Sequence, residues 1–199
     1  MQPIKSFLKE LIIVVAISLV IVLPIRFFIA QPFIVSGDSM DMTFANRQYL
    51  IVDQFTYKFV EEPKRGEVVV FRVPEEALAL SNYALDKRMY FIKRIVGIPG
   101  DTVEVNGNDV TIFNTENPEG MKLKEDYVYI DKMIPTRNVS LKITLKSDEY
   151  FVMGDNRNNS SDSRFWGPLK RSNITGRPIV RLFPFTKISI FPGYSQFEK

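Results

Sequence analysis

Residues 101–113 read DTVEVNGNDVTIF, and this stretch gives the clearest structural signal of the chain. Asn106 and Gly107 suit the tight type I′ turn that joins two twisted antiparallel strands, so the stretch predicts a β-hairpin. Short runs of β-forming residues recur on both sides of it between turn signals, which is typical of a mainly β fold. These runs are YLIVDQF (49–55), GEVVVFRVP (66–74), MYFIKRIVGIPGD (89–101), LKITL (141–145), EYFVMGDN (149–156) and ITGRPIVRLFP (174–184).

The strand pattern predicts an all-β domain of two small antiparallel sheets packed together, or a partly open barrel. Residues 75–86, EEALALSNYALD, are the one helical candidate after the N-terminal region, and they are equally compatible with a loop. Residues 114–149 are polar and charged. We therefore expect residues 102–149 to form an insertion or subdomain without a catalytic role.

An apolar segment precedes this domain, LIIVVAISLVIVLPIRFFIA from Leu11 to Ala30, with Arg26 as its only charge. At about 1.5 Å per helical residue, such a segment crosses a hydrocarbon layer of about 30 Å, so it predicts a single transmembrane anchor. A cleaved secretory signal with an apolar region from Leu11 to Leu23 is an alternative, but Phe28 disrupts the small-x-small cleavage pattern before Ala30. A buried core helix is the other alternative.

The charges around the apolar segment predict its orientation. Lys5 and Lys9 precede it, and positively charged flanks favour the cytoplasmic side. We expect residues 1–10 in the cytoplasm, 11–30 in the plasma membrane and 31–199 outside the cytoplasm.

Composition excludes several kinds of chemistry. Of the net charge of +3, residues 1–30 contribute +2 (three basic residues and one acidic), which leaves +1 for residues 31–199, so no nucleic-acid partner is expected. The 199 residues include no Cys and no His, which rules out a Ser-His-Asp triad, a thiol nucleophile and a His- or Cys-ligated metal.

Ser39 lies in SGDSMDMT (36–43), just beyond the apolar segment. A serine nucleophile needs a base within hydrogen-bond reach, and without His that base is a lysine or a carboxylate. Gly37 would let the chain turn sharply and let a peptide come close. The alternative is that Ser39 is only a turn residue.

Lys93 is the candidate base, in the strand-like run YFIKRIVGIPGD (90–101). Strand alternation places it on the same face as Phe91 and Ile95. Apolar surroundings penalise the ammonium form, which would lower the lysine pKa toward the 7 to 8 useful in a general base. The alternative is an exposed lysine on an edge strand.

A third stretch, GDNRNNSSDSRFWG (154–167), carries charges of alternating sign at Asp155, Arg157, Asp162 and Arg164. This pattern suits a loop fixed by ion pairs and by side-chain hydrogen bonds to the backbone. A calcium loop is the alternative, but the arginines and the missing bidentate Glu argue against it. No metal site is expected.

Together, in this order and behind an apolar N-terminal run, SGDSMDMT, RGEVVVFRVP (65–74), FIKRIVGIPGD and GDNRNNSSDSRFWG resemble the type I signal peptidases. These are membrane-bound Ser/Lys endopeptidases of the bacterial secretory pathway. The resemblance implies that Ser39 is the nucleophile, Lys93 the general base and Ser160 the residue that orients the lysine. It also implies supporting roles for Arg94, Asp155, Arg157, Asp162 and Arg164, and shallow substrate pockets lined by Phe33, Val35 and Ile92.

The resemblance further implies cleavage of secreted preproteins after small-x-small, A-x-A-like sites through an acyl-enzyme, without a cofactor. The expected partners are signal-peptide-bearing preproteins, the lipid bilayer and, transiently, the secretion translocon. Two residues depart from the family pattern. Met42 replaces the usual Pro, and Gly37 replaces a Ser or Thr that donates into the oxyanion hole in some members, so we expect the Ser39 backbone N–H to serve there.

Two rival functions share some of these features. A self-cleaving Ser/Lys protein of the repressor type would use the same dyad, but that class lacks the anchor and the 154–167 pattern. A membrane-tethered β domain without activity, which binds secretion substrates or scaffolds a translocon, is the second rival.

Overall fold

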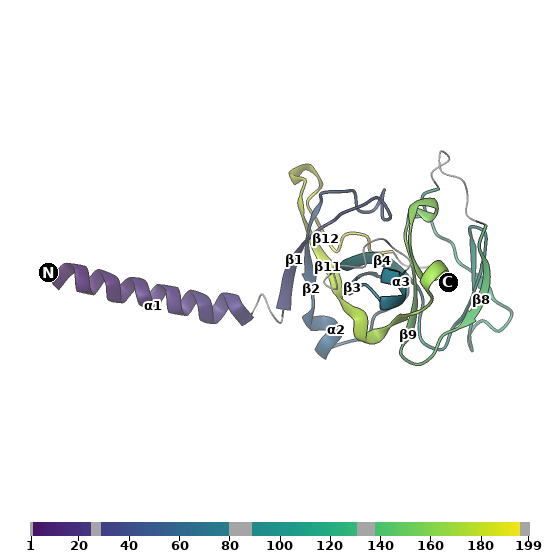
Figure 1. Cartoon of the computed structure of the whole chain (residues 1–199), viewed down its shortest axis with the longest axis horizontal. Coiled ribbons are helices and arrows are strands. Elements are labelled where there is room, and N and C mark those ends of the chain that lie inside the picture. Colours follow the sequence, from purple (N-terminus) through teal and green to yellow (C-terminus); the bar gives the residue numbers. More distant parts are fainter. Residues whose placement is uncertain (1, 25–28, 80–88, 131–137, 196–199) are drawn as a thin grey trace.

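The computed structural model of the chain describes residues 2–24, 29–79, 89–130 and 138–195. Helix α1 (Gln2–Pro24) precedes two β-sheets, and every strand pairing recorded among the described residues is antiparallel (Figure 1). The mainly β fold predicted from the strand runs is therefore confirmed.

The larger sheet has eight strands in the order β1-β2-β11-β3-β4-β9-β10, with β12 paired to β11. Its strands are β1 (Ala30–Ile34), β2 (Tyr49–Asp53), β3 (Val68–Arg72), β4 (Tyr90–Gly97), β9 (Glu149–Met153), β10 (Leu169–Lys170), β11 (Ile174–Phe183) and β12 (Ser189–Ile190). The smaller sheet has the order β7-β6-β5-β8, with β5 (Thr102–Asn106), β6 (Asp109–Phe113), β7 (Met121–Lys122) and β8 (Ser140–Thr144). Two antiparallel sheets were expected, but one is larger than predicted.

Short helices connect the strands. They are α2 (Phe55–Phe59), α3 (Glu75–Ala79), α4 (Ser163–Trp166) and the 3₁₀ turns η2 (Arg157–Asn159), η3 (Arg171–Asn173) and η4 (Phe185–Lys187). The run predicted as strand over 49–55 stops early because the Asp53 carboxylate accepts the backbone N–H groups of Phe55 and Thr56, which starts α2. Helix α3 covers the first part of the predicted 75–86 helix, and residues 80–86 lie outside the described residues.

The predicted hairpin is present, with β5 and β6 joined by a two-residue turn at Gly107 and Asn108. Gly107 has a φ of 61°, whereas Asn108 does not enter the positive-φ region. A type I′ turn needs positive φ at both central residues, so the predicted turn type is wrong although the hairpin is right.

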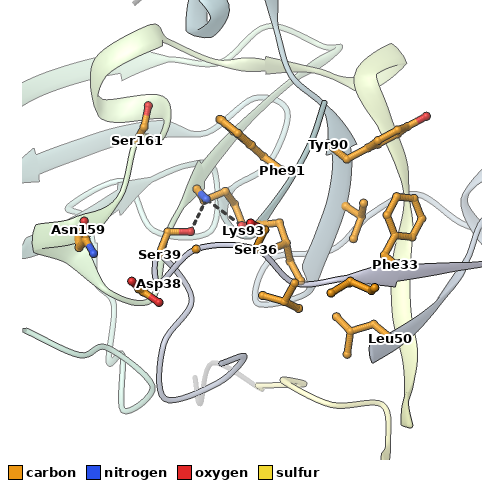
Figure 2. Close-up of a pocket in the computed structure, with 15 residues that line it drawn as sticks. Phe33, Ser36, Asp38, Ser39, Leu50, Tyr90, Phe91, Lys93, Asn159 and Ser161 are labelled. Atoms are coloured by element: carbon orange, nitrogen blue, oxygen red, sulfur yellow. Dashed lines mark hydrogen bonds between the residues drawn. The ribbon is translucent and has the colours of Figure 1, made fainter. Parts of the chain in front are cut away.

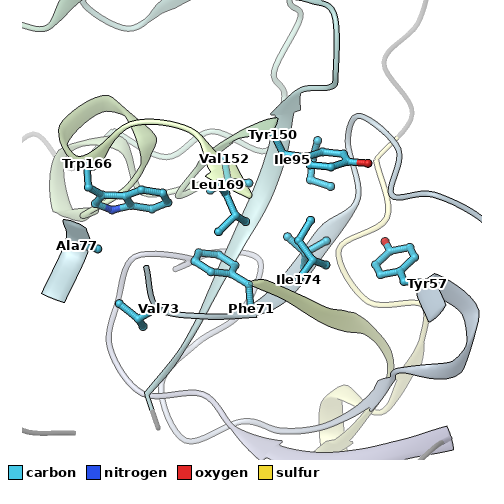
Figure 3. Close-up of a cluster of buried hydrophobic side chains, with 11 residues drawn as sticks. Tyr57, Phe71, Val73, Ala77, Ile95, Tyr150, Val152, Trp166, Leu169 and Ile174 are labelled. Carbon is cyan, nitrogen blue, oxygen red and sulfur yellow. The ribbon is translucent and has the colours of Figure 1, made fainter. Parts of the chain in front are cut away.

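Two apolar cores lie on opposite faces of the β4–β9 pair. On one face Phe71, Ile95 and Val152 pack with Trp166 (Figure 3). The second core joins the other face to the small sheet and contains Val96, Val103, Val105, Val110, Ile112, Leu123, Leu145, Phe151 and Met153. Figure 1 shows β9 between the rest of the larger sheet and β8. Residues 93–97 of β4 are buried, so packing fixes the positions of the side chains in this half of the strand.

Helix α1 exposes its apolar side chains along the part whose side chains are described, from Phe7 to Val22. Within the described residues the helix covers Gln2–Pro24, and Ala30, the last residue of the predicted 11–30 segment, belongs to β1. Within the described residues, no helix has the length and apolarity required to span a membrane. The anchor therefore stays a prediction.

Candidate active site

Ser39 and Lys93 come together across 54 residues of sequence (Figure 2). Ser39 lies in the loop after β1, which the buried side chains of Met40 and Phe44 hold against the sheet. Lys93 projects from β4, and its Nζ lies 2.7 Å from Ser39 Oγ. Nζ also donates a hydrogen bond of 2.9 Å to the carbonyl oxygen of Ile92. A serine hydroxyl and a lysine amine are thus in proton-transfer contact.

Lys93 is only 3% exposed, and its Nζ lies 5.1 Å from the centre of the Phe91 ring. Burial disfavours the ammonium form and lowers the pKa of Lys93 to about 8, although the charges of Asp162 and Asp155 act in the opposite direction. Strand β4 lies between β3 and β9, which contradicts the alternative of an edge-strand lysine.

Arg94, the next residue, points into the protein and binds the Asp155 carboxylate with two parallel hydrogen bonds of 2.9 and 2.6 Å. Both side chains are almost fully buried. Thr43 Oγ1 donates to the same carboxylate at 2.6 Å, so Asp155 connects β4 to the loop that carries Ser39. Two-point pairing of this kind fixes orientation as well as distance.

A second buried pair lies at the other end of the 154–167 loop. The Arg164 guanidinium binds both oxygens of Asp162 at 2.8 Å and donates to the carbonyl of Arg157 at 2.7 Å. Burial raises the pKa of Asp162, but the hydrogen bonds from Arg164 and from the Gly154 N–H outweigh it, so the pKa is lowered overall. Arg157 pairs with Glu125 and donates to the Gly154 carbonyl. Because arginines occupy both Asp carboxylates, the calcium-loop alternative loses its ligands.

The expected hydrogen bond between Ser160 and Lys93 is not formed among the described residues. Lys93 Nζ uses the Ile92 carbonyl and Ser39 instead. Ser160 is buried behind Gly154, where a Cβ on the glycine would lie 2.3 Å from Ser160 Oγ and 2.5 Å from the Ser39 carbonyl oxygen. Ser160 therefore borders the backbone of the nucleophile rather than binding the lysine.

Two residues that the sequence did not single out hold the Ser39 loop. The Asn156 N–H donates to the Ser39 carbonyl at 3.0 Å, and Asn156 Nδ2 donates to the Asp38 carbonyl at 3.2 Å. Gly154 provides the close approach described above. The sequence offered one indication of their role, which is that they flank Asp155 in the triplet GDN.

A cavity of about 400 Å³ opens beside Ser39 and Lys93. The three residues expected to bind substrate, Phe33, Val35 and Ile92, all line it. Figure 2 shows the two ends of this cavity, with Asp38, Asn159 and Ser161 on one side of the Ser39–Lys93 pair and Phe33, Leu50 and Tyr90 on the other. The Tyr90 and Phe33 rings meet edge to face, 5.1 Å between centres, and sequence reasoning missed Tyr90.

The two departures from the family pattern have a backbone explanation. Met42 has a φ of 75°, which the ring of a proline forbids, so the usual Pro cannot occupy this turn. Gly37 has a φ of 98°, a backbone conformation that favours glycine, although a Cβ at this position would meet no atom within 4 Å. The Ser39 N–H donates to no backbone carbonyl of the described residues.

Comparison with known proteins identifies the family of the chain. The family model described as "Signal peptidase, peptidase S26" matches residues 8–183. The "Probable signal peptidase I-1" of Synechocystis sp. is 37% identical over 94% of this chain and 89% of its own length. The "Signal peptidase I" of Leptolyngbya laminosa is 38% identical over 92% of this chain and 83% of its own. A crystal structure of a signal peptidase I from Enterococcus faecalis V583 aligns with 59% of this chain and 97% of its own, at 26% identity and a TM-score of 0.44. The chain therefore belongs to the signal peptidase family, peptidase S26.

Proposed function

We propose that this protein is a membrane-anchored serine endopeptidase that removes N-terminal signal peptides from secreted preproteins. The observation that carries the proposal is the 2.7 Å separation between Ser39 Oγ and a buried Lys93 Nζ at the wall of an open cavity. Family membership supports the reaction class.

Chemistry begins with the neutral amine of Lys93. It accepts the Ser39 hydroxyl proton while Oγ attacks the scissile carbonyl carbon, and the Ser39 backbone N–H stabilises the developing oxyanion. The C–N bond then breaks, and Lys93 returns the proton to the leaving amine, which leaves an acyl-enzyme. Lys93 then deprotonates a water molecule, which attacks the ester carbonyl carbon. The bond from that carbon to Ser39 Oγ breaks, Oγ takes the proton back from Lys93, and the signal peptide is released.

The cavity supports a preference for small side chains before the cut. Phe33, Val35 and Ile92 line it with apolar side chains, and they are proposed to shape subsites which accept alanine and reject larger side chains. Strand β1 ends the order of the larger sheet and lines the cavity. Its outer edge has no partner strand among the described residues, so it can pair with the extended cleavage segment of a preprotein.

The N-terminal segment is the proposed membrane anchor, with residues 1–10 in the cytoplasm and residues 31–199 outside it. The exposed apolar side chains of α1 support this arrangement, and the exposed rings of Phe183, Phe185 and Phe191 offer a further lipid contact. Anchoring confines enzyme and preprotein to one surface, near the translocon that delivers the substrate, and raises their effective concentration.

Residues 102–149 are the proposed non-catalytic module of the catalytic domain. The support is that no described residue of this range lines the cavity beside Ser39. Within the range, Glu125 pairs with Arg157, and the Tyr129 backbone forms hydrogen bonds with the 154–167 loop, so the module stabilises that loop.

The test measures cleavage of a preprotein with an A-x-A signal end by the full-length enzyme in detergent. Ser39→Ala and Lys93→Ala should each abolish cleavage while the thermal unfolding midpoint shows that the fold persists. Ser161→Ala, at the polar end of the cavity, is the matched control for Ser39→Ala and should retain cleavage. Near-full activity of Lys93→Ala would refute the Ser/Lys mechanism, and an inactive wild type would favour the binding-domain rival.

A further inference from the structure

The chain beyond residue 183, where the family match ends, returns to the active site. Residues 189–194 form a segment that we call the C-terminal strap. Its first part is β12, which pairs with β11 through Ile190 and Val180, and the Phe191 N–H donates to the Ile179 carbonyl at 2.8 Å. These bonds guide the strap along β11 toward the buried arginine of the site.

The strap turns its backbone inward and its large side chains outward. Ile190 is 74% exposed and Tyr194 is 62% exposed, whereas Pro192 is buried. The Gly193 carbonyl oxygen accepts a hydrogen bond of 2.6 Å from Arg94 Nη1. Among the described residues the Arg94 side chain makes four hydrogen bonds, and the other three go to Gly66 and, twice, to Asp155.

Gly193 also touches the loop that carries Ser39. A Cβ at this position would lie 2.8 Å from the Phe44 ring and 2.9 Å from the Thr43 methyl group. Thr43 is the residue whose hydroxyl donates to Asp155. The strap thus reaches the Ser39 loop twice, directly at residues 43–44 and indirectly through Arg94 and Asp155.

We propose that the C-terminal strap is part of the catalytic framework, with Gly193 as a positioning residue that holds the Ser39 loop in its reactive geometry. The proposal rests on the proposed peptidase function. Its physical basis is that a buried guanidinium without its full set of acceptors is costly, so Arg94 and the loop tied to it are fixed only while the strap is seated.

The test compares Gly193→Ala with Gly107→Ala in the full-length enzyme. Both glycines have positive φ, 78° and 61°, so both variants carry backbone strain, but the Cβ at Gly107 would meet no atom within 4 Å. We expect Gly193→Ala to lower kcat by about tenfold or more per folded molecule with KM nearly unchanged, because small displacements of reacting groups slow the chemical step. Gly107→Ala should keep the wild-type kcat. Equal kcat values for the two variants, corrected for the folded fraction, would overturn the proposal.

A second measurement distinguishes an effect on the Ser39 loop from general misfolding of the variant. Phe44→Leu removes the ring atoms that lie 2.8 and 3.0 Å from the added methyl group and leaves the Thr43 contact at 2.9 Å. The loss of kcat caused by Gly193→Ala should therefore be at least about threefold smaller in the Phe44→Leu background than in the wild type. An equal loss in both backgrounds would show that Gly193 does not act through the loop. If the wild type itself does not cut the preprotein, the proposed function fails; if it does and Gly193→Ala is normal, only the strap proposal fails.

Discussion

The two sheets use ion pairs in opposite ways. In the larger sheet, Arg94 of β4 pairs with Asp155, which lies in the loop after β9, and their side chains are 1% and 0% exposed. In the smaller sheet, those of Lys122 and Asp109 are 64% and 63% exposed, although their atoms are just as close, at 2.8 Å. Exposed pairs contribute little because water solvates the separated charges almost as well, whereas a buried pair must stay intact or leave a charge unsolvated. Distance alone therefore does not identify the pairs that shape a site.

The largest effect is expected from Asp155→Asn, which removes the charge opposite Arg94. A buried arginine left without its carboxylate destabilises a protein by about 3–5 kcal/mol, and here the Thr43 contact weakens as well. Denaturant unfolding monitored by tryptophan fluorescence measures this loss. A change in unfolding free energy below about 1 kcal/mol would mean that the Arg94–Asp155 pair contributes no more than an exposed pair.

Gly154→Ala should have the next largest effect, on rate rather than on stability. The added methyl group would lie 2.5 Å from the Ser39 carbonyl oxygen, so the nucleophile must move. We expect kcat to fall about 100-fold, as for misplacements of about 1 Å in other enzymes. Adding Ser160→Gly removes the contact with Ser160 but not the one with Ser39, so the double variant should stay slow; full recovery would contradict this account.

The pH dependence of kcat/KM tests whether burial lowers the pKa of Lys93. Because only the neutral amine accepts the Ser39 proton, kcat/KM should rise with pH to a plateau above the Lys93 pKa of about 8. At pH 7 the rate should be about one tenth of the plateau. A profile that is flat between about pH 6.5 and 9 would mean that Lys93 is not the base.

The same pKa predicts a stability change of defined sign. Between about pH 8 and the ordinary lysine value of 10.5, the unfolded chain binds a proton at Lys93 that the folded protein has released, so stability should rise with pH in this window. Lys93→Met should lack that rise. Equal pH slopes for the two proteins would contradict the depressed pKa.

The smallest effect is expected from Asp109→Asn, the same substitution placed in the exposed pair. Unfolding free energy should change by less than about 0.5 kcal/mol, and kcat should not change. The identical denaturant and cleavage assays apply. A loss of unfolding free energy comparable to that of Asp155→Asn would show that the buried and the exposed ion pairs contribute equally.

Local sequence patterns predicted most of the strands, because the residues next to one another in a strand show whether it is buried. Each predicted β run contains a strand, and the apolar neighbours of Lys93 indicated its burial correctly. Strand β1 was missed because AQPFI has little β pattern and depends on pairing with β2. The Asn156 contact with Ser39 and the Gly193 contact with Arg94 join distant segments, and no local pattern encodes them. The hydrogen bond expected between Ser160 and Lys93 is not formed among the described residues, because Lys93 Nζ bonds to Ser39 Oγ and to the Ile92 carbonyl, and the role of Ser160 stays a prediction.

The β4–β9 pair is buried on both faces, and this limits how such a chain can change in length. Loops of the smaller sheet can lengthen or shorten without reaching the cavity. Removing the whole sheet, however, would leave Val96, Phe151 and Met153 facing water. We therefore expect a shortened homologue that lacks this sheet to carry polar residues at those three positions.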